Sequence, residues 1–297
     1  MSSASLIKIV SSLLGPIETK PSSVELKLKK LNGIKAVIFD VYGTLLTAST
    51  HLKIIPEPSE DYDQSIIDAL EGADFDILDV TEKFSEIYIG HLRAHYDIRA
   101  AEGITYPEVN ICDVWQDYLN ELFSNGSIDG DITERSIMKL IMRHECNVAP
   151  VWPQKNILQA IRTIQDSGIS LGTIATAQFY TPIVMEALFQ NSLDTLGFKH
   201  PICVWSYEHQ HRKPSELLYD ICANGLKDLG INTNEAVYVG NDVLNDMLPA
   251  SKHGFKTALF AGDAHSLRLH LDKDDCKKFK PNIIFNDFSQ LVDCVVI

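Results

Sequence analysis

The fold is decided by the stretch Ile34-Lys35-Ala36-Val37-Ile38-Phe39-Asp40-Val41-Tyr42-Gly43-Thr44-Leu45-Leu46. An apolar run rich in β-branched residues stops at an acid, Asp40, and a Gly-Thr pair follows soon after. This pattern predicts a buried parallel strand that delivers Asp40 into a loop at its carboxyl end. Open α/β sheets bind ligands at that edge, so Asp40 is the first candidate functional residue. Asp and Gly also favour turns for local backbone reasons, so the rest of the chain has to supply partners.

The composition is that of a globular protein with an acidic surface. The 297 residues allow one large domain or two of ordinary size. The chain has 40 acidic and 26 basic residues and a formal net charge of −14. Nucleic acids and anionic membranes repel such a surface, so we expect neither as a partner. A small anionic substrate would need a local positive pocket.

The cysteines and the amino terminus indicate a cytoplasmic protein. The six cysteines are scattered without a C-x-x-C pair, which is typical of reduced thiols. No apolar run approaches the length of a membrane span, and Ser5–Leu14 is short and interrupted by Lys8. We interpret Ser5–Leu14 as a small amphipathic helix in an N-terminal extension, residues 1–33. The helix-start signal Pro21-Ser22-Ser23 predicts a second short helix in this extension.

A helical domain is inserted after the first strand. The next convincing buried strand, Ile169–Ala175, begins more than a hundred residues later, far beyond the length of a normal crossover. Apolar residues at three- and four-residue spacing predict helices at Gln64–Leu70, Val80–Asp97, Val114–Phe123 and Ile132–Arg143. We therefore predict a helical cap at residues 54–146 and a core formed by residues 34–53 and 147–297.

After Val151 short strands alternate with helices. Strands are predicted at Ile169–Ala175, Ile202–Trp205, Ala236–Gly240, Lys256–Phe260 and Asn282–Phe285, and helices near Lys155–Asp166, Pro182–Phe189, Ser215–Ala223 and Asn245–Lys252. This alternation predicts an α/β fold with a doubly wound, mainly parallel sheet. Right-handed crossovers then bring the carboxyl ends of the strands to one edge.

Polar residues follow the predicted strands where partners of Asp40 are needed. Thr176 ends the second strand, Lys213 follows the third, and Gly240-Asn241-Asp242 with Asp246 follows the fourth. A fixed ammonium near Asp40 would keep that carboxylate ionised and offset charge on an anionic substrate. Carboxylates without nearby Cys or His suit Mg²⁺. An Asp at this position can also simply cap a helix.

These four segments, in this order, resemble the motifs of the haloacid dehalogenase-like (HAD) hydrolases, which have a Rossmann-like core and commonly a helical cap. The resemblance implies that Asp40 is a nucleophile forming a covalent aspartyl intermediate and that Thr44, Thr176 and Lys213 complete the catalytic set. It implies that Tyr42, Gly43 and Ala177 contact the substrate. It also implies a Mg²⁺ ion held by Asp40, Asp242 and the backbone carbonyl of Tyr42, with Asp246 in support. An alternative alignment that starts at Gly240 puts Asn241 in the position of Asp242.

One position departs from the phosphatases of this family. They usually carry a second Asp two residues after the nucleophile as proton donor and acceptor, but this chain has Tyr42 there, a phenol and a poor proton shuttle at neutral pH. Tyr42 and Tyr219 resemble the 2-haloacid dehalogenases, which need no metal, whereas Asp242 favours a metal. An unpaired carboxylate beside Asp40 is costly unless a cation lies between them. The sequence thus predicts a Mg²⁺-dependent phosphatase of a small phosphate monoester, with a dehalogenase and a non-catalytic binding or regulatory protein as alternatives.

Substrate recognition is assigned to a polar stretch of the cap. Arg93, Arg99 and Tyr106 lie in it, and an Arg facing the cleft suits a carboxylate or a phosphate. A solvated helix face explains the same residues without a function. The protein is expected to be a monomer or a homodimer.

Overall fold

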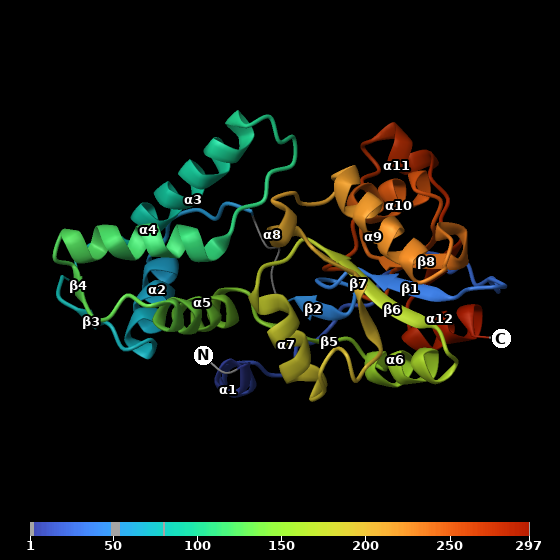
Figure 1. The fold of residues 1–297 in the computed structure, drawn as a ribbon, viewed down its shortest axis with the longest axis horizontal. Helices are drawn as coiled ribbons and strands as arrows, with labels where there is room; N and C mark the ends of the chain where they lie inside the picture. The colour runs from blue at the N-terminus through green and yellow to red at the C-terminus, as the bar shows by residue number, and fades with distance from the viewer. Residues whose placement is uncertain (1–2, 49–53, 80, 297) are drawn as a thin grey trace.

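The computed structural model describes residues 3–48, 54–79 and 81–296. Within them, six parallel strands form one sheet in the order β10-β9-β8-β1-β6-β7. Figure 1 shows the neighbouring strands β8, β1, β6 and β7 of this sheet. The strands are β1 (Ala36–Phe39), β6 (Ser170–Ala175), β7 (Phe198–Trp205), β8 (Ala236–Gly240), β9 (Lys256–Phe260) and β10 (Ile283–Phe285). The predicted α/β fold with a parallel sheet is confirmed.

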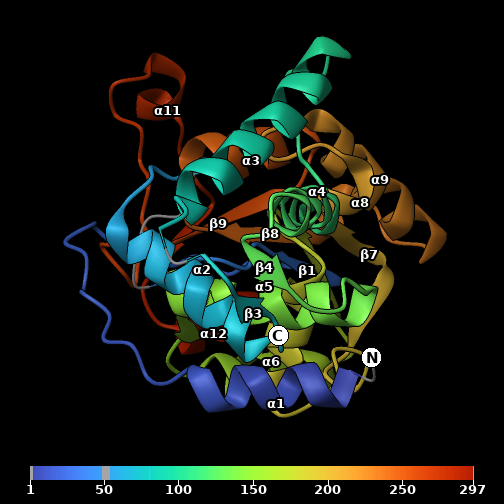
Figure 2. The same cartoon turned by 90° about the vertical axis from the view of Figure 1, so that its left-hand side faces the viewer.

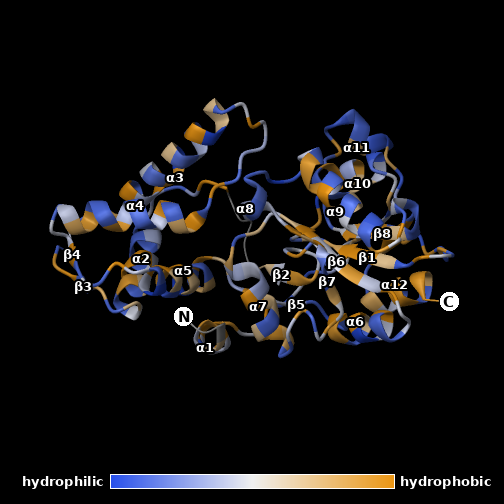
Figure 3. Ribbon diagram, viewed as in Figure 1, coloured by the Kyte–Doolittle hydropathy of each residue, from blue (hydrophilic) through white to orange (hydrophobic). Residues whose placement is uncertain are grey.

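Strand β1 lies at the centre of the sheet, between β8 and β6. Alternation along the strand sends Val37 and Phe39 into one hydrophobic core and Ala36 and Ile38 into the other. Both faces are covered, which explains why the strand is apolar throughout rather than alternating with polar residues. Figure 3 shows the same apolar character along the central strands.

Helices cover both faces of the sheet. Helices α6 (Ile157–Asp166), α7 (Tyr180–Phe189) and α12 (Phe288–Val295) share the core of Val37 and Phe39. Helices α9 (Glu216–Asp228) and α10 (Leu248–Lys252) share the core of Ala36 and Ile38. Short elements complete this part: α8 (Ser206–His209), α11 (Asp274–Lys278), the 3₁₀ turn η1 (Thr233–Glu235) and the π-helical turn η2 (Val243–Met247).

The insertion leaves and rejoins the sheet-containing part through two antiparallel strands, β2 (Leu46–Ala48) and β5 (Val151–Pro153). Between them are α2 (Glu60–Gly72), α3 (Phe84–Ala101), α4 (Ile111–Ser124), α5 (Glu134–Val148) and the small pair β3 (Asp76–Ile77) and β4 (Ile128–Asp129). These helices enclose a core of their own around Trp115 and Tyr118. Residues 49–53 and Val80, where the predicted core ends and the second predicted helix begins, lie outside the described residues.

The described part of the N-terminal extension contains one helix, α1 (Ser3–Leu13), which packs against α5 of the insertion and α7 beside the sheet. Figure 2 shows α1 lying below α5. The second predicted helix, after Ser23, is wrong: Lys27 instead exchanges two backbone hydrogen bonds of 2.9 Å with Ile284 of β10. The edge strand offers unpaired N–H and C=O groups, and an extended segment satisfies them whereas a helix cannot. No helix among the described residues is long and apolar enough to span a membrane.

Candidate active site

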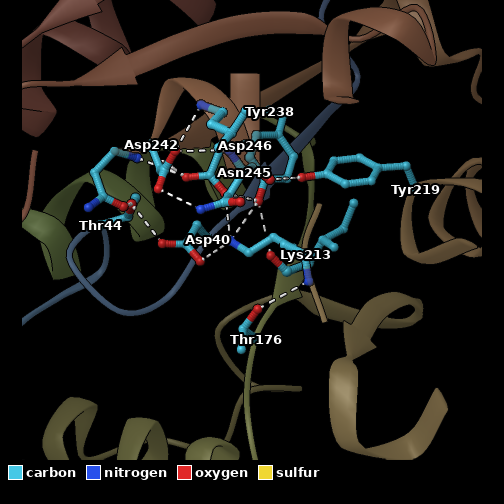
Figure 4. A network of polar contacts seen from close by, with 12 residues as sticks. Asp40, Thr44, Thr176, Lys213, Tyr219, Tyr238, Asp242, Asn245 and Asp246 are labelled. Atoms are coloured by element: carbon cyan, nitrogen blue, oxygen red, sulfur yellow. Dashed lines mark hydrogen bonds and ion pairs between the residues drawn. The ribbon is translucent and has the colours of Figure 1, made fainter. Parts of the chain in front are cut away.

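Four strand ends bring the predicted polar residues together (Figure 4). Asp40 follows β1, Thr176 follows β6, Lys213 lies between β7 and α9, and Asp242 and Asp246 follow β8. All the strands run parallel, so their carboxyl ends share one edge of the sheet.

Lys213 connects two carboxylates. Its Nζ donates to Oδ1 of Asp40 at 2.5 Å and to Oδ1 of Asp246 at 2.6 Å. All three side chains are buried. Burial by itself lowers the pKa of Lys213, but the charges of Asp246 and Asp40 outweigh it and raise this pKa above its ordinary value. The lysine therefore stays charged and holds Asp40 in place.

Asp246 is fixed by further donors. Tyr238 donates its hydroxyl to Oδ1 at 3.0 Å, and the backbone N–H groups of Asn241 and Asp242 donate to Oδ2 at 3.1 Å. A Cβ at Gly240 would lie 2.3 Å from Oδ2 of Asp246, so only glycine fits there. The predicted supporting role of Asp246 corresponds here to orienting Lys213.

The second oxygen of Asp40 faces Thr44 and Asn241. The Thr44 hydroxyl, with its single proton, lies 3.1 Å from Oδ2 of Asp40 and 3.2 Å from Oδ1 of Asn241. The Asn241 amide is oriented because its Nδ2 donates to the carbonyl of Ser266 at 2.5 Å. Gly43 has a φ of +86°, and a Cβ there would lie 2.5 Å from Nδ2 of Asn241. The geometry thus requires glycine at position 43. The Asp40 and Asn241 oxygens share the single hydroxyl proton of Thr44.

Asp242 is used differently from the sequence-based expectation. Its Oδ1 accepts hydrogen bonds from the backbone N–H groups of Leu244 and Asn245, and His270 lies 2.9 Å from the same atom. Its Oδ2 accepts from the Asn245 side chain at 2.8 Å. The carboxylate therefore caps the η2 turn. Asn241, from the alternative alignment, shares the Thr44 hydroxyl with Asp40, and both Asn241 and Asp242 line the cavity beside Asp40.

Among the described residues, no group of three or more His, Cys, Asp or Glu could hold a metal ion. A cation at this edge of the sheet would therefore have to be bound by oxygens of different kinds, from a carboxylate and an amide. The side-chain oxygens of Asp40 and Asn241 that share the Thr44 proton are of the hard type that Mg²⁺ accepts. The residues fit such an ion, with one carboxylate fewer than predicted.

The anion-binding groups are partly preorganised. The Thr176 hydroxyl accepts from the backbone N–H of Lys213 at 3.3 Å, whereas the N–H of Ala177 already donates to Ser206 at 2.8 Å. Within the described part of the chain, the N–H groups of Val41 and Tyr42 find no acceptor. Two adjacent free N–H groups beside Asp40 can receive the oxygens of an anion.

The Tyr42 hydroxyl contacts Thr181, at the start of α7. The two hydroxyl oxygens lie 2.9 Å apart. Burial raises the pKa of Tyr42 well above its ordinary value, although the hydrogen bond with Thr181 opposes this shift. Tyr42 therefore stays a neutral phenol and is a poor proton acceptor.

Two adjoining cavities open beside Asp40. The first, the catalytic cavity, has a volume of about 280 Å³ and is lined by Asp40, Lys213, Asn241 and the 265–268 loop. The second, the tyrosine chamber, has a volume of about 440 Å³ and lies between the insertion and the sheet. Its lining includes five tyrosines: Tyr42, Tyr62, Tyr88, Tyr96 and Tyr180. Tyr42, Ile54, Thr176 and Arg212 line both cavities.

The predicted recognition residues of the insertion lie elsewhere. Arg93 is exposed on α3, and Arg99 forms an ion pair of 3.0 Å with Glu102 one turn further along the chain. Tyr106 is 38% exposed and borders a separate groove. Neither cavity beside Asp40 includes these three residues in its lining. Their role in substrate binding stays a prediction.

Sequence reasoning did not single out two residues of the chamber. Arg212 directly precedes Lys213, and its place after a strand at the ligand-binding edge was a usable signal. Glu145 lies near the end of α5, and burial raises its pKa to about 7, although a hydrogen bond of 2.9 Å from Tyr180 opposes this shift. Nothing in the helical pattern of α5 distinguishes Glu145 from an ordinary surface acid.

Comparison with known proteins identifies the family of the chain. The family model of the haloacid dehalogenase-like hydrolases matches residues 34–254. A 2-haloacid dehalogenase from Pseudomonas syringae pv. Tomato DC3000 superimposes with a TM-score of 0.53 at 17% identity, covering 88% of this chain and 97% of that one. A HAD phosphatase from Thermococcus onnurineus has a TM-score of 0.48 at 16% identity, covering 89% and 100%. No curated protein matches the sequence. The chain belongs to the haloacid dehalogenase-like hydrolase family.

Proposed function

We propose that this hydrolase is a Mg²⁺-dependent phosphatase that cleaves a small phosphate monoester through a covalent aspartyl-phosphate on Asp40. The observation that carries the proposal is the oxygen pair of Asp40 and Asn241, which share the one proton of Thr44. One of these acceptors is always left without a full hydrogen bond, and a cation would satisfy both. When bound, Mg²⁺ would neutralise charge on the transferring phosphoryl group.

The side chains of this protein would then act as follows. Lys213 orients Asp40 and offsets its negative charge, because its ammonium lies 2.5 Å from Oδ1. The free N–H groups of Val41 and Tyr42, with the Thr176 hydroxyl, receive the phosphoryl oxygens. Asp40 attacks phosphorus and the bond to the leaving oxygen breaks; water then attacks the aspartyl-phosphate, which releases inorganic phosphate and restores the carboxylate.

The leaving oxygen receives little help from the protein. Tyr42 is a phenol whose hydroxyl is engaged with Thr181. Water must then supply the proton, which favours leaving groups of low pKa. We therefore expect aryl phosphates to react faster than alkyl phosphates.

A metal-free 2-haloacid dehalogenase is the second candidate. It is favoured by the neutral residue Asn241 facing Asp40 and by Tyr42, because a departing halide needs no proton. In this reading Lys213 alone would balance the charge of Asp40. A binding or regulatory protein without turnover is the remaining alternative.

One experiment separates these functions. The protein is assayed with phenyl phosphate and with 2-chloropropionate, each in Mg²⁺ and in EDTA. We expect phosphate release that stops in EDTA and returns with Mg²⁺, and complete loss of that activity in Asp40→Asn with an unchanged circular dichroism spectrum. Halide release that persists in EDTA would establish the dehalogenase instead, and no turnover of either substrate would favour the binding protein.

A further inference from the structure

Arg212 occupies the junction of the catalytic cavity and the tyrosine chamber. It lines both, and it directly precedes Lys213, whose ammonium contacts Asp40. A substrate that places its phosphate at Asp40 and its body in the chamber has to pass this side chain.

The backbone of Arg212 is held by the insertion. Its N–H donates to the carbonyl of Tyr106 at 2.9 Å, and the N–H of Glu108 donates to the carbonyl of Gln210 at 3.0 Å. Pro107 and His211 form an antiparallel bridge between the same two loops. The starting point of the Arg212 side chain is thereby fixed relative to both cavities.

Among the described residues, none pairs with the Nε of the Arg212 guanidinium. This Nε is buried, and no side chain in the described part of the molecule forms an ion pair with Arg212. A buried donor without an acceptor is costly, so an arginine in this state points to a missing anion.

Glu108 lies close enough to Arg212 for the two groups to interact electrostatically, but its oxygens accept hydrogen bonds from other donors. Its two oxygens already accept hydrogen bonds from Tyr96 at 3.0 Å, Ser206 at 2.8 Å and Gln178 at 3.1 Å, and from the N–H of Val109 at 3.1 Å. Glu108 therefore acts on Arg212 only at longer range, and the planar fork of the guanidinium stays available.

The tyrosine chamber sets the character of the rest of the ligand. At about 440 Å³ it has the size of a small-molecule site. Tyrosine rings and apolar side chains such as Leu92 form most of its wall. An organic body of apolar or aromatic character fits such a wall better than a bare inorganic anion.

We infer that Arg212 determines specificity by binding a second anionic group, a carboxylate or a phosphate, on the organic part of the substrate. This inference rests on the proposed phosphatase function, because the first anion is the phosphate that Asp40 attacks. Arg suits this task because its fork of donors matches both groups in a bidentate manner.

Matched aryl phosphates test the inference. Wild type, Arg212→Met and Arg212→Lys are assayed with 3- and 4-carboxyphenyl phosphate, with the uncharged carbamoylphenyl phosphates of the same shape, and with 1,4-phenylene bisphosphate. We expect wild type to prefer the carboxylates or the bisphosphate over the carbamoyl compounds in kcat/KM. Arg212→Met should lose about ten- to hundredfold on the preferred compounds and little on the carbamoyl ones, since one charge-assisted contact is removed. Arg212→Lys should recover part of the preference. Whether wild type prefers the carboxylates or the bisphosphate shows which anionic group Arg212 binds.

The control is Arg162→Met, which makes the same change on the exposed face of α6 and should leave the preference unchanged. An equal loss on charged and uncharged substrates in Arg212→Met would overturn the inference, because Arg212 would then bind the transferring phosphate. The inference would also be overturned if wild type had the same kcat/KM for the carboxyl and the carbamoyl compounds, in both the 3- and the 4-isomers.

A binding measurement separates failure of this inference from failure of the proposed function. Calorimetry compares 3- and 4-hydroxybenzoate with the matching hydroxybenzamides, in wild type and in Arg212→Met. If no aryl phosphate is hydrolysed, the phosphatase proposal fails, yet tighter benzoate binding that requires Arg212 would still support the anion site. Equal binding of acid and amide would refute it.

Discussion

Lys213 Nζ lies 2.6 Å from Oδ1 of Asp246, and this buried ion pair positions the same ammonium 2.5 Å from the nucleophile candidate Asp40. Asp246 is only 1% exposed. The acid that follows β8 therefore acts on Asp40 through a lysine that follows β7. Three separate strand ends thus share the orientation of Asp40.

Asp246→Asn should destabilise the fold strongly. The amide keeps the size of the side chain, but its NH₂ group cannot accept the hydrogen bonds that the carboxylate receives from Lys213 or from the backbone N–H groups, and a buried donor left unsatisfied costs about 1–3 kcal/mol. Urea unfolding should report this loss, while Asp228→Asn on the exposed end of α9 should change stability by less than about 0.5 kcal/mol. Equal stability of the two variants would mean that the pair contributes nothing.

Asn241→Asp should make the protein more sensitive to Mg²⁺. The substitution adds a carboxylate beside Oδ2 of Asp40 and removes the Nδ2 donor to Ser266, so it should lower stability without metal and raise it with metal. Thermal unfolding at increasing Mg²⁺ should show a larger rise in Tm than in wild type. A Tm that ignores Mg²⁺ in both proteins would argue against a cation between these residues.

Asp242→Ala should affect stability more than metal dependence. The Asp242 carboxylate caps the η2 turn, and replacing such a cap by Ala costs about 0.5–2 kcal/mol. The Mg²⁺ concentration for half-maximal activity should stay within about threefold of wild type, a change worth less than 1 kcal/mol. A much higher Mg²⁺ requirement would restore Asp242 as the metal ligand predicted from the sequence.

Tyr42→Phe should retain most activity. The hydroxyl is engaged with Oγ1 of Thr181 at 2.9 Å, and burial raises the pKa of Tyr42, so the phenol keeps its proton near pH 7 and provides no phenolate base. We expect kcat within about threefold of wild type and a stability loss of about 1 kcal/mol from the lost hydrogen bond. A fall in kcat of about a hundredfold, the contribution of a general acid or base, would assign Tyr42 a proton-transfer role.

His144 should make the fold sensitive to acid. Burial lowers its pKa from 6.5 to about 3, while Ser65 opposes this shift slightly. Between these values the unfolded chain binds a proton that the folded chain does not, so stability falls as pH drops below about 6.5, by up to about 1.4 kcal/mol per pH unit. The stability advantage of wild type over His144→Gln should therefore shrink between pH 6.5 and 5, as measured by urea unfolding. Glu145 is present in both proteins, so its own titration largely cancels in the difference.

The sequence by itself determined the parallel sheet and the chemistry at its edge. The apolar run before Asp40 requires burial on both faces, and the alternation of strands and helices after Val151 leaves few arrangements other than a doubly wound sheet. Thr176 and Lys213 were found because parallel strands end at the same edge, so position along the chain already implies proximity. Such periodicities are local and can be read from neighbouring residues.

Only the tertiary structure decided which side chains turn toward Asp40. Asn241 and Asp242 are adjacent and both polar, and the choice depends on Ser266, Thr44 and His270, which hold the two side chains from distant segments. The extended segment at Lys27 likewise depends on a free edge at β10, which the sequence around Lys27 does not reveal. Among the described residues the Arg212 Nε has no acceptor, while Glu108, brought in by the insertion, accepts from other donors. Contacts between segments far apart in the chain set these orientations, and no local sequence pattern encodes them.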